Sequence, residues 1–128
     1  MTYVLDTSIA IHLRDGDALI SERIGALEGA ILLSIITKVE LEGGVYRQPS
    51  QAVERRVRLD KMLRALPVIA FDDLAAEAYR HIVEVAGYSR RKLLDRMIAA
   101  QALAVEATLI TCNGQDFRDV PGLQLLEW

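Results

Sequence analysis

The chain has 128 residues, of which 52% are hydrophobic and only 5% aromatic, and its formal net charge is -3. This length suits one domain (residues 1–128) with one core, and the longest uncharged runs, such as residues 29–37, are shorter than the roughly 20 residues of a membrane-spanning helix. The acidic balance argues against broad, non-specific nucleic-acid binding, and the single cysteine cannot form an internal disulfide, so a reducing, cytoplasmic location is expected.

The first half of the chain alternates between apolar runs of strand length and segments with helical spacing. A first strand ends at Leu5, and Ser8 is expected to cap a short helix that ends near Gly16. The next expected elements are a helix capped by Asp17 and stopped by Gly29, a strand at 30–34, and a helix that begins at Thr37. The pair Gly43-Gly44 either ends that helix or provides a point of close packing.

The second half continues the same alternation. The expected elements are a charged amphipathic helix at 51–65, a strand at 67–71, a helix at 74–86, a basic loop at 89–92, a helix at 94–106, a strand at 108–112, a loop with at most one helical turn at 113–117, and a strand at 123–127. Strands that alternate with helices predict an α/β fold with right-handed crossovers. We expect a mainly parallel sheet of about five strands, flanked by helices on both faces, because its strands read as aliphatic runs.

Acidic residues stand at four predicted junctions between strands and helices. Asp6 and Asp116 follow the first and fourth strands, Glu40 lies in the first turns after the second strand, and Asp95 opens the most apolar helix. In open α/β sheets, ligands bind beyond the carboxyl ends of the strands, where the strand order reverses. A helix that runs antiparallel to the strands would bring Asp95 to that same edge. The sequence therefore predicts that four carboxylates meet there.

Each acid has an ordinary explanation when it is taken alone. Asp6 and Asp95 suit helix caps, Asp116 suits a turn, and Glu40 suits a solvated helix surface. The combination is different, because two like charges about 4 Å apart repel by roughly 4 kcal/mol at an effective dielectric of 20. A hard dication removes that repulsion, and oxygen ligands without clustered His or Cys favour Mg²⁺ or Mn²⁺ over Zn²⁺. Such a site indicates a hydrolase of phosphorylated substrates.

The segments that carry these acids resemble the signature segments of PIN-domain ribonucleases, and most closely those of the VapC-type toxins of toxin–antitoxin pairs. They are residues 5–8 (LDTS), 36–41 (ITKVEL), 94–100 (LDRMIAA) and 111–117 (TCNGQDF). Their order and spacing carry the resemblance, which extends from Tyr3 to Trp128. It implies a single domain with a PIN-like fold, in which the four acids are the metal ligands and the catalytic groups.

The resemblance also implies an activity and a set of partners. The expected reaction is Mg²⁺-dependent hydrolysis of single-stranded or looped RNA, with Mn²⁺ able to replace Mg²⁺, leaving 5′-phosphate and 3′-hydroxyl ends. Ser8, Thr111 and Asn113 would orient carboxylates or water. The expected partners are the RNA substrate, a cognate antitoxin that occupies the groove near the site, and a second copy of the chain in a homodimer. DNA would be bound only indirectly, through the antitoxin, and no membrane is expected as a partner.

Basic residues that flank Asp95 are candidates for contact with RNA. They are Arg90, Arg91, Lys92 and Arg96. Arginine contacts with phosphates would position the strand rather than read its sequence. Arg96 also departs from the resemblance, because many family members have an aliphatic or small residue at that place.

The residues leave other functions open. A phosphatase of the haloacid-dehalogenase type would need Asp-x-Asp after the first strand, where this chain has Asp6-Thr7-Ser8. A receiver-like phospho-acceptor could use Asp72 after the third strand, but the chain lacks the acidic pair near the first strand and the Lys after the last. A non-catalytic interaction module with an acidic metal-binding pocket is the remaining alternative.

Overall fold

A computed structural model describes all residues from Met1 to Trp128, and five strands form its single sheet. The strands are β1 (Thr2–Leu5), β2 (Ala30–Ser34), β3 (Val68–Ile69), β4 (Thr108–Thr111) and β5 (Gln124–Glu127). Their order is β3-β2-β1-β4-β5, and every neighbouring pair is parallel. The predicted α/β class is confirmed, and the sheet is parallel throughout rather than mainly so.

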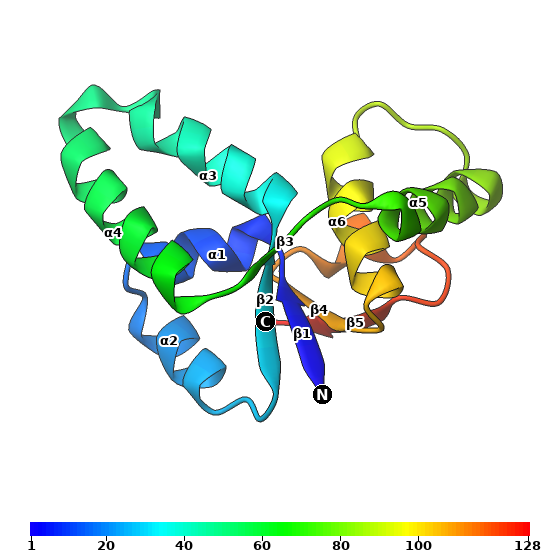
Figure 1. Cartoon of the computed structure of the whole chain (residues 1–128), viewed down its shortest axis with the longest axis horizontal. Helices are drawn as coiled ribbons and strands as arrows, with labels where there is room; N and C mark the ends of the chain where they lie inside the picture. Colours follow the sequence, from blue (N-terminus) through cyan, green and yellow to red (C-terminus); the bar gives the residue numbers. More distant parts are fainter.

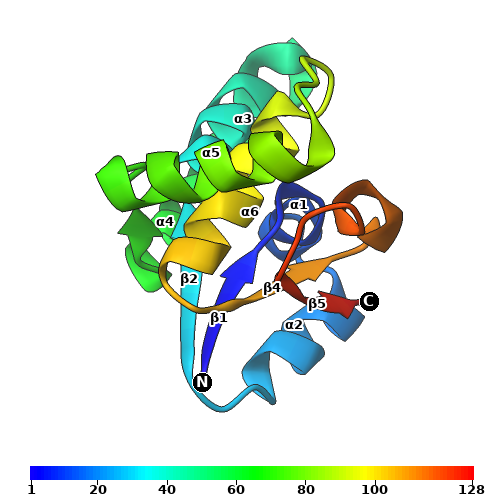
Figure 2. The ribbon, with the colours of Figure 1, turned by 90° about the vertical axis from the view of Figure 1, so that its right-hand side faces the viewer.

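Helices cover both faces of this sheet. They are α1 (Thr7–Arg14), α2 (Ala18–Gly25), α3 (Ile35–Arg47), α4 (Ala52–Ala65), α5 (Asp73–Ala86) and α6 (Leu93–Ala104), with short 3-10 turns η1 (Pro49–Gln51) and η2 (Gly114–Phe117). Figure 1 shows α1, α2, α3 and α4 to one side of the strands and α5 and α6 to the other. Seen from the side, α5 lies across α6, against which it packs (Figure 2). None of the helices combines the length and apolar character that crossing a membrane requires.

The strands divide their side chains between two cores, as their two-residue period requires. Tyr3 and Leu5 pack into the cluster under α1, α2, α3 and α4, while Val4 between them packs against α5 and α6. Both clusters consist mainly of Leu, Ile, Val and Ala. Because both faces are covered, the central strands read as continuous apolar runs and not as an alternation of apolar and polar residues.

Helix α3 differs most from its predicted bounds. It begins at Ile35 because the hydroxyl of Ser34 accepts a hydrogen bond from the backbone N–H of Ile36 at 2.9 Å, which is a cap that the sequence analysis did not identify. The helix also continues through both glycines to Arg47. A Cβ on Gly44 would make an ordinary contact of 3.5 Å with Nη1 of the buried Arg14, so neither glycine ends the helix and neither is required by close packing.

The strand order places β1 at the centre of the sheet, with β2 and β3 on one side and β4 and β5 on the other. The chain therefore reverses its direction of winding beside the carboxyl ends of β1 and β4, where an α/β sheet binds its ligands. A receiver-like protein has the order 2-1-3-4-5, which differs from the order found here. The receiver alternative is thus excluded at the level of the fold.

Candidate active site

Asp6 directly follows the central strand β1, and the residue is only 4% exposed. It precedes the first residue of α1, yet its carboxylate caps no backbone N–H of that helix. Instead, Oδ2 accepts hydrogen bonds from Ser8 Oγ at 2.9 Å and from Thr111 Oγ1 at 2.8 Å. Oδ1 accepts none and keeps access to solvent, since it is not among the buried unsatisfied atoms. Helix capping therefore does not explain this acid, and one of its oxygens is free to bind a ligand.

Glu40 is held by two threonines that the sequence analysis did not single out. Thr7 Oγ1 donates to Glu40 Oε1 at 2.8 Å and lies 2.9 Å from Thr37 Oγ1. A hydroxyl has one proton, so Thr37 must donate to Thr7 while Thr7 donates to Glu40. Thr37 is fully buried, whereas Glu40 is half-buried. The relay fixes one carboxylate oxygen of Glu40 and leaves the other without a protein partner.

Asp95 lies in the first turn of α6, close enough to the other acids to be affected by their charge. Its carboxylate caps no helix and has no hydrogen-bond partner in the protein. Burial, followed by the negative charges of Asp6, Asp116 and Glu40, raises the pKa of Asp95 to about 6. Lys92 acts in the opposite direction. The four predicted acids, which come from four separate elements of the chain, therefore share one electrostatic environment at the carboxyl edge of the sheet.

Asp116 is carried by η2, which follows β4. Its backbone N–H bonds to the carbonyl of Asn113 at 3.0 Å, and its half-buried carboxylate has no hydrogen-bond partner in the protein. Asn113 was expected to orient a carboxylate or water with its side chain. In the structure this side chain is exposed and makes no hydrogen bond, while its backbone N–H donates to Thr111 Oγ1 at 3.0 Å. Asn113 thus supports Thr111 through its backbone.

The turn that carries Asp116 is fastened to the last strand by Glu127. Glu127 Oε2 accepts a hydrogen bond from the backbone N–H of Gly114 at 2.8 Å, and Oε1 lies 3.4 Å from Arg118 Nη2. A Cβ on Gly114 would come within 2.6 Å of the Glu127 carboxyl carbon. Only glycine at this position leaves room for that carboxylate. The sequence does not show this requirement, because it arises only when β5 lies beside β4.

Gly114→Ala is expected to expel the Glu127 carboxylate and lower the free energy of unfolding by about 1 kcal/mol, the typical value of a lost hydrogen bond. The matched control is Gly43→Ala in α3, where a Cβ meets nothing within 4 Å. That change should raise stability by roughly 0.5–1 kcal/mol, because alanine favours the helix. Urea unfolding of both variants measures the difference. Equal effects of the two changes would contradict the fastening of η2 by Glu127.

The donor set suits a hard divalent cation, although its members are not pre-assembled as a ligand cage. No three His, Cys, Asp or Glu side chains are gathered in the geometry of a metal site. The available donors are carboxylate oxygens, with free oxygens on Asp6 and Glu40, and their mutual repulsion adds to burial in raising the pKa of Asp95. A cation among them would relieve that repulsion, and oxygen-only donors match Mg²⁺. The residues present therefore fit the expected metal in chemistry and in charge.

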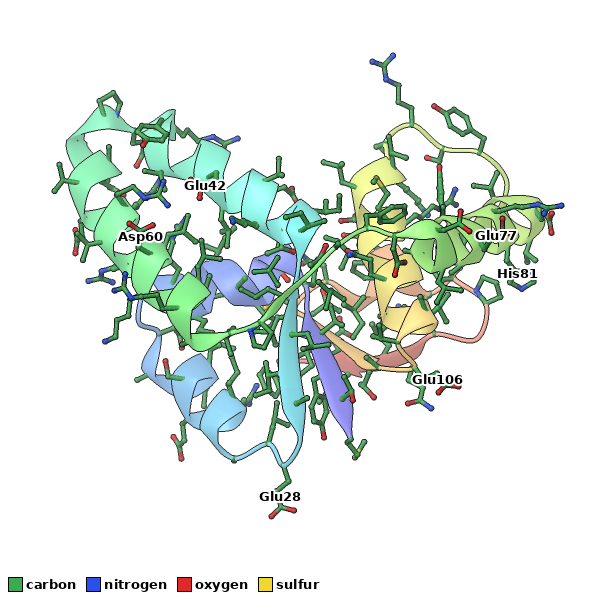
Figure 3. The ribbon with its side chains drawn as sticks, viewed as in Figure 1. Glu28, Glu42, Asp60, Glu77, His81 and Glu106 are labelled. Carbon is green, nitrogen blue, oxygen red and sulfur yellow. The ribbon has the colours of Figure 1, made fainter.

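The other acids of the chain form a useful contrast. Figure 3 labels Glu28, Glu77 and Glu106, which point outward from the periphery of the molecule, and Asp60, which lies on α4. Asp60 accepts a hydrogen bond from Arg56 Nη2 at 2.7 Å, and Glu77 lies 3.6 Å from Arg80 Nη1. The four acids at the sheet edge have hydroxyl partners or none and form no ion pair with a Lys or Arg.

The basic residues next to Asp95 do not all face outward. Arg90 and Arg91 are exposed on the loop before α6, and their contact with RNA stays a prediction. Lys92 is half-buried, and its Nζ bonds to Asp119 Oδ2 at 2.9 Å. Arg96 is only 2% exposed, and its guanidinium is directed into the protein. The expectation of an RNA contact is therefore corrected for Arg96, whose charge is already used by Asp119 at 3.1 Å.

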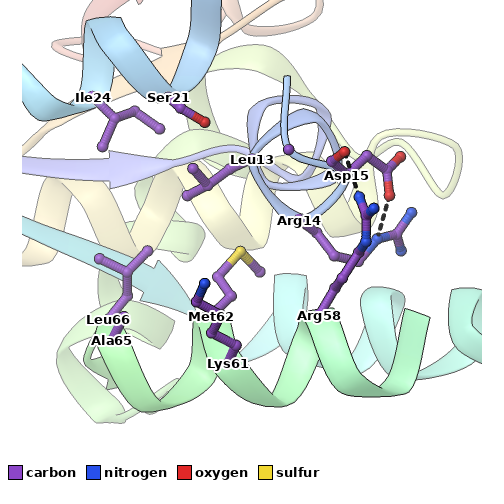
Figure 4. Close-up of a pocket in the computed structure, with 11 residues that line it drawn as sticks. Leu13, Arg14, Asp15, Ser21, Ile24, Arg58, Lys61, Met62, Ala65 and Leu66 are labelled. Atoms are coloured by element: carbon purple, nitrogen blue, oxygen red, sulfur yellow. Dashed lines mark hydrogen bonds and ion pairs between the residues drawn. The ribbon is translucent and has the colours of Figure 1, made fainter. Parts of the chain in front are cut away.

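A pocket with a volume of about 570 Å³ lies away from the four acids, between α1, α2 and α4 (Figure 4). Its apolar lining includes Leu13, Ile24 and Met62, and its cations are Arg14, Arg58 and Lys61. One carboxylate, that of Asp15, accompanies them and accepts from Arg14 Nε at 3.0 Å. Site and pocket lie near opposite ends of α1, a helix of eight residues and therefore about 12 Å long.

Residues 3–123 of the chain match the family model described as the PIN domain. The chain is 29% identical to Ribonuclease VapC2 of Rickettsia felis and 30% identical to Ribonuclease VapC1 of Haemophilus influenzae, and each match covers 100% of this chain and 98% of the relative. Its fold is similar to a chain in the crystal structure of VapBC2 from Rickettsia felis bound to a DNA fragment from their promoter. That likeness has a TM-score of 0.86 at 28% identity, and covers 100% of this chain and 99% of that one.

Proposed function

Because this chain belongs to the PIN-domain family and is similar to its VapC ribonucleases, we propose that it is a metal-dependent endoribonuclease and the toxin of a toxin–antitoxin pair. The observation that carries the proposal is the placement of Asp6, Glu40, Asp95 and Asp116 at the carboxyl edge of the sheet, where burial and then the charges of the other three acids raise the pKa of Asp95 to about 6. Such a gathering of like charges is unfavourable in the free protein and is typical of a site built for a cation or for chemistry.

In the proposed site, Asp6 and Asp95 are the main ligands of Mg²⁺, or of Mn²⁺ in its place. Glu40 either binds the metal or accepts a proton from the attacking water, and Asp116 completes the site directly or through water. The bound ion would supply activation of water and stabilisation of the charge that develops on the phosphate.

The protein's own contribution is to hold these carboxylates in place. Ser8 and Thr111 both donate to Oδ2 of Asp6, which stops the carboxylate from rotating and presents Oδ1. Thr7 does the same for Glu40 through Oε1, with Thr37 fixing the threonine in turn. Carboxylates held in this way need little reorganisation when the reaction begins, which is the main physical source of electrostatic catalysis. The exposed Arg90 and Arg91 would hold the phosphates of the RNA strand.

The proposal predicts that RNA cleavage depends strictly on a divalent cation. Purified protein incubated with a total RNA pool should cleave it in Mg²⁺, lose that activity in excess chelator, and recover it when Mg²⁺ or Mn²⁺ is restored. The products should carry 5′-phosphate and 3′-hydroxyl ends, which a phosphate-dependent 5′ exonuclease detects. Cleavage that persists in excess chelator, or products with 2′,3′-cyclic phosphate ends, would contradict a metal-dependent mechanism.

The proposed protein partner is a cognate antitoxin, through which DNA would be bound indirectly. The similar structure from Rickettsia felis is of VapBC2 with promoter DNA. In this chain, the pocket of Figure 4 offers both an apolar surface and two accessible cations, Arg58 and Lys61, within reach of the site along α1. Co-expression with the neighbouring reading frame tests this part: a complex in which RNA cleavage is suppressed is the expected result.

A homodimer is the remaining part of the proposal. Large apolar side chains are exposed on α3, α4 and α5, namely Val39, Tyr46, Val53, Val57, Leu74 and Val85. Exposed apolar residues in such numbers on a small chain support association with another surface. Sedimentation equilibrium of the isolated chain measures the mass directly, and a mass of one chain at all concentrations would remove the dimer from the proposal.

A further inference from the structure

Arg96 connects three separate segments at the edge of the candidate active site. Its Nη1 donates to the backbone carbonyl of Gly87 at 2.5 Å, at the end of α5, and its Nη2 donates to Asp119 Oδ2 at 3.1 Å, after η2. Its own backbone lies in the first turn of α6, one residue after Asp95. A single guanidinium therefore joins the start of α6 to the segment that follows Asp116 and to the loop that carries Arg90 and Arg91.

The burial of this arginine is costly and needs a compensating role. The residue is 2% exposed, and its Nε is a buried polar atom without any hydrogen-bond partner. Burying a charged group is costly even when it is paired, as Arg96 is with Asp119, and the unsatisfied Nε adds to that cost. An aliphatic side chain would fill the same space without these penalties. We therefore expect Arg96 to contribute less to the stability of the fold than to the placement of the three segments that it joins.

Asp119 is the centre of this connection. Its Oδ2 accepts hydrogen bonds from both Arg96 and Lys92, and the two cations hold the pKa of Asp119 below its usual range. Phe117, two residues earlier, is buried in the same core cluster as Ile98 and Ala99 of α6. The turn that carries Asp116 is thus held against α6 by an apolar contact on one side and by the ion pair on the other.

We propose that Arg96 is a positioning residue of the proposed ribonuclease: together with Asp119 it fixes Asp95 at the distance from Asp116 that cation binding and catalysis require. This inference rests on the proposed function, because it assigns the residues that hold two of its four acids in register. Neither Arg96 nor Asp119 touches the reacting groups.

The test compares Asp119→Asn, Asp119→Glu and Arg96→Met in the full chain. Asp119→Asn is expected to lower kcat for RNA about 10-fold, since small misplacements of catalytic groups cost up to about 100-fold. KM should stay the same or fall, because the freed Lys92 can attract phosphate. Asp119→Glu keeps the charge and should restore most of kcat. Arg96→Met should lower kcat further, and adding Asp119→Asn to it should cause little additional loss.

A second measurement does not depend on activity. Titration of the RNA-free protein with Mn²⁺, followed by electron paramagnetic resonance, should give a Kd several-fold higher for Asp119→Asn than for wild type, with Asp119→Glu between them. The matched control is Asp60→Asn on α4, a carboxylate that also accepts from an arginine but has no hydrogen bond or ion pair with any site residue. That variant should match wild type in kcat, KM and Mn²⁺ affinity.

The possible results separate this inference from the proposed function. Wild-type protein that neither cleaves RNA nor binds Mn²⁺ overturns the proposed function and the positioning role together. Wild-type activity with unchanged kcat and Mn²⁺ affinity in Asp119→Asn overturns the positioning role alone. A loss that appears only in KM overturns it as well, because it would mark a contact with RNA. If Arg96→Met does not fold, Asp119→Asn decides the question, because Asp119 lies on an exposed loop.

Discussion

Asp6→Asn is expected to lower RNA cleavage by about 10²–10³-fold, the loss that typically follows removal of one electrostatic group from an active site. The amide is nearly the same shape as the carboxylate, and its oxygen can still accept the hydrogen bonds of Ser8 and Thr111. The negative charge that would attract the cation is lost, while the packing at the end of β1 is kept. Single-turnover cleavage at saturating Mg²⁺ measures the effect on the chemical step.

The control for Asp6→Asn is Asp60→Asn, which removes a carboxylate from the surface of α4 and should leave cleavage unchanged. Circular dichroism and thermal unfolding should show that both variants keep the fold. Cleavage at the wild-type rate by Asp6→Asn would rule out a metal-ligand role for this residue and, with it, the proposed site.

Asp95→Asn is expected to lower RNA cleavage about as much as Asp6→Asn does. Unusually for an active-site change, it is also expected to stabilise the metal-free protein. The pKa of Asp95 in the folded chain is about 6, against 3.8 for an unperturbed aspartate, because burial and three neighbouring carboxylates disfavour its charge. A difference of about two pKa units corresponds to roughly 3 kcal/mol. Because Asp95 is only half-buried, solvent screening reduces the expected gain to about 1–2 kcal/mol.

The gain from Asp95→Asn should depend on pH in a defined direction. Below about pH 4 the carboxyl group is protonated in the folded and the unfolded chain, so wild type and variant should be equally stable. Between about pH 4 and pH 6 the unfolded chain releases this proton while the folded chain keeps it, and the free energy of unfolding of wild type falls. Above about pH 6 the free energy of unfolding of Asp95→Asn should exceed that of wild type by the full expected amount. Urea unfolding at pH 4 and pH 8 in chelator measures both limits.

Added Mg²⁺ should make the wild-type protein more stable than Asp95→Asn. A cation that binds only the folded wild type stabilises it by about 2.7 kcal/mol at 100 times its Kd, and it should stabilise Asp95→Asn much less. The matched control is Asp73→Asn, which removes an acid from the first turn of α5 just as Asp95→Asn does from α6. It should cost a few tenths of a kcal/mol through the helix dipole, with no response to Mg²⁺. A gain in stability from Asp73→Asn, or an equal response to Mg²⁺ in all three proteins, would contradict burial and mutual repulsion of Asp95 as the cause.

The fold and the four acids could be predicted from the sequence because both depend on local patterns. Apolar runs and helical spacing identify strands and helices, and the carboxyl ends of parallel strands lie on one edge by construction. Asp6 and Asp116 were therefore placed correctly relative to the sheet. The sheet order was not specified by the sequence, since short strands such as Val68–Ile69 can occupy several places at an edge.

The side chains around the acids could not be predicted in the same way, because their roles depend on partners far away in the chain. Arg96 reads as an exposed basic residue until Asp119 is brought beside it. Thr7 reads as part of a short motif, and its bond to Glu40 crosses 33 positions. The closeness in sequence of Thr7 and Ser8 to Asp6, of Thr37 to Glu40 and of Thr111 to Asp116 would have been a weak signal. Only the tertiary contacts show which hydroxyl group holds which carboxylate.

Asp6 and Thr111, which meet at the centre of the sheet, are 105 positions apart, and Asp116 follows still later. During synthesis at roughly 5–20 residues per second, Asp6 and Glu40 leave the ribosome several seconds before the residues that complete their site. A nascent or prematurely terminated chain that lacks β4 therefore has neither Asp116 nor the hydroxyl that fixes Asp6. For a protein whose activity would attack the RNA around it, the late position of β4 in the chain delays that activity until translation of the chain is nearly finished.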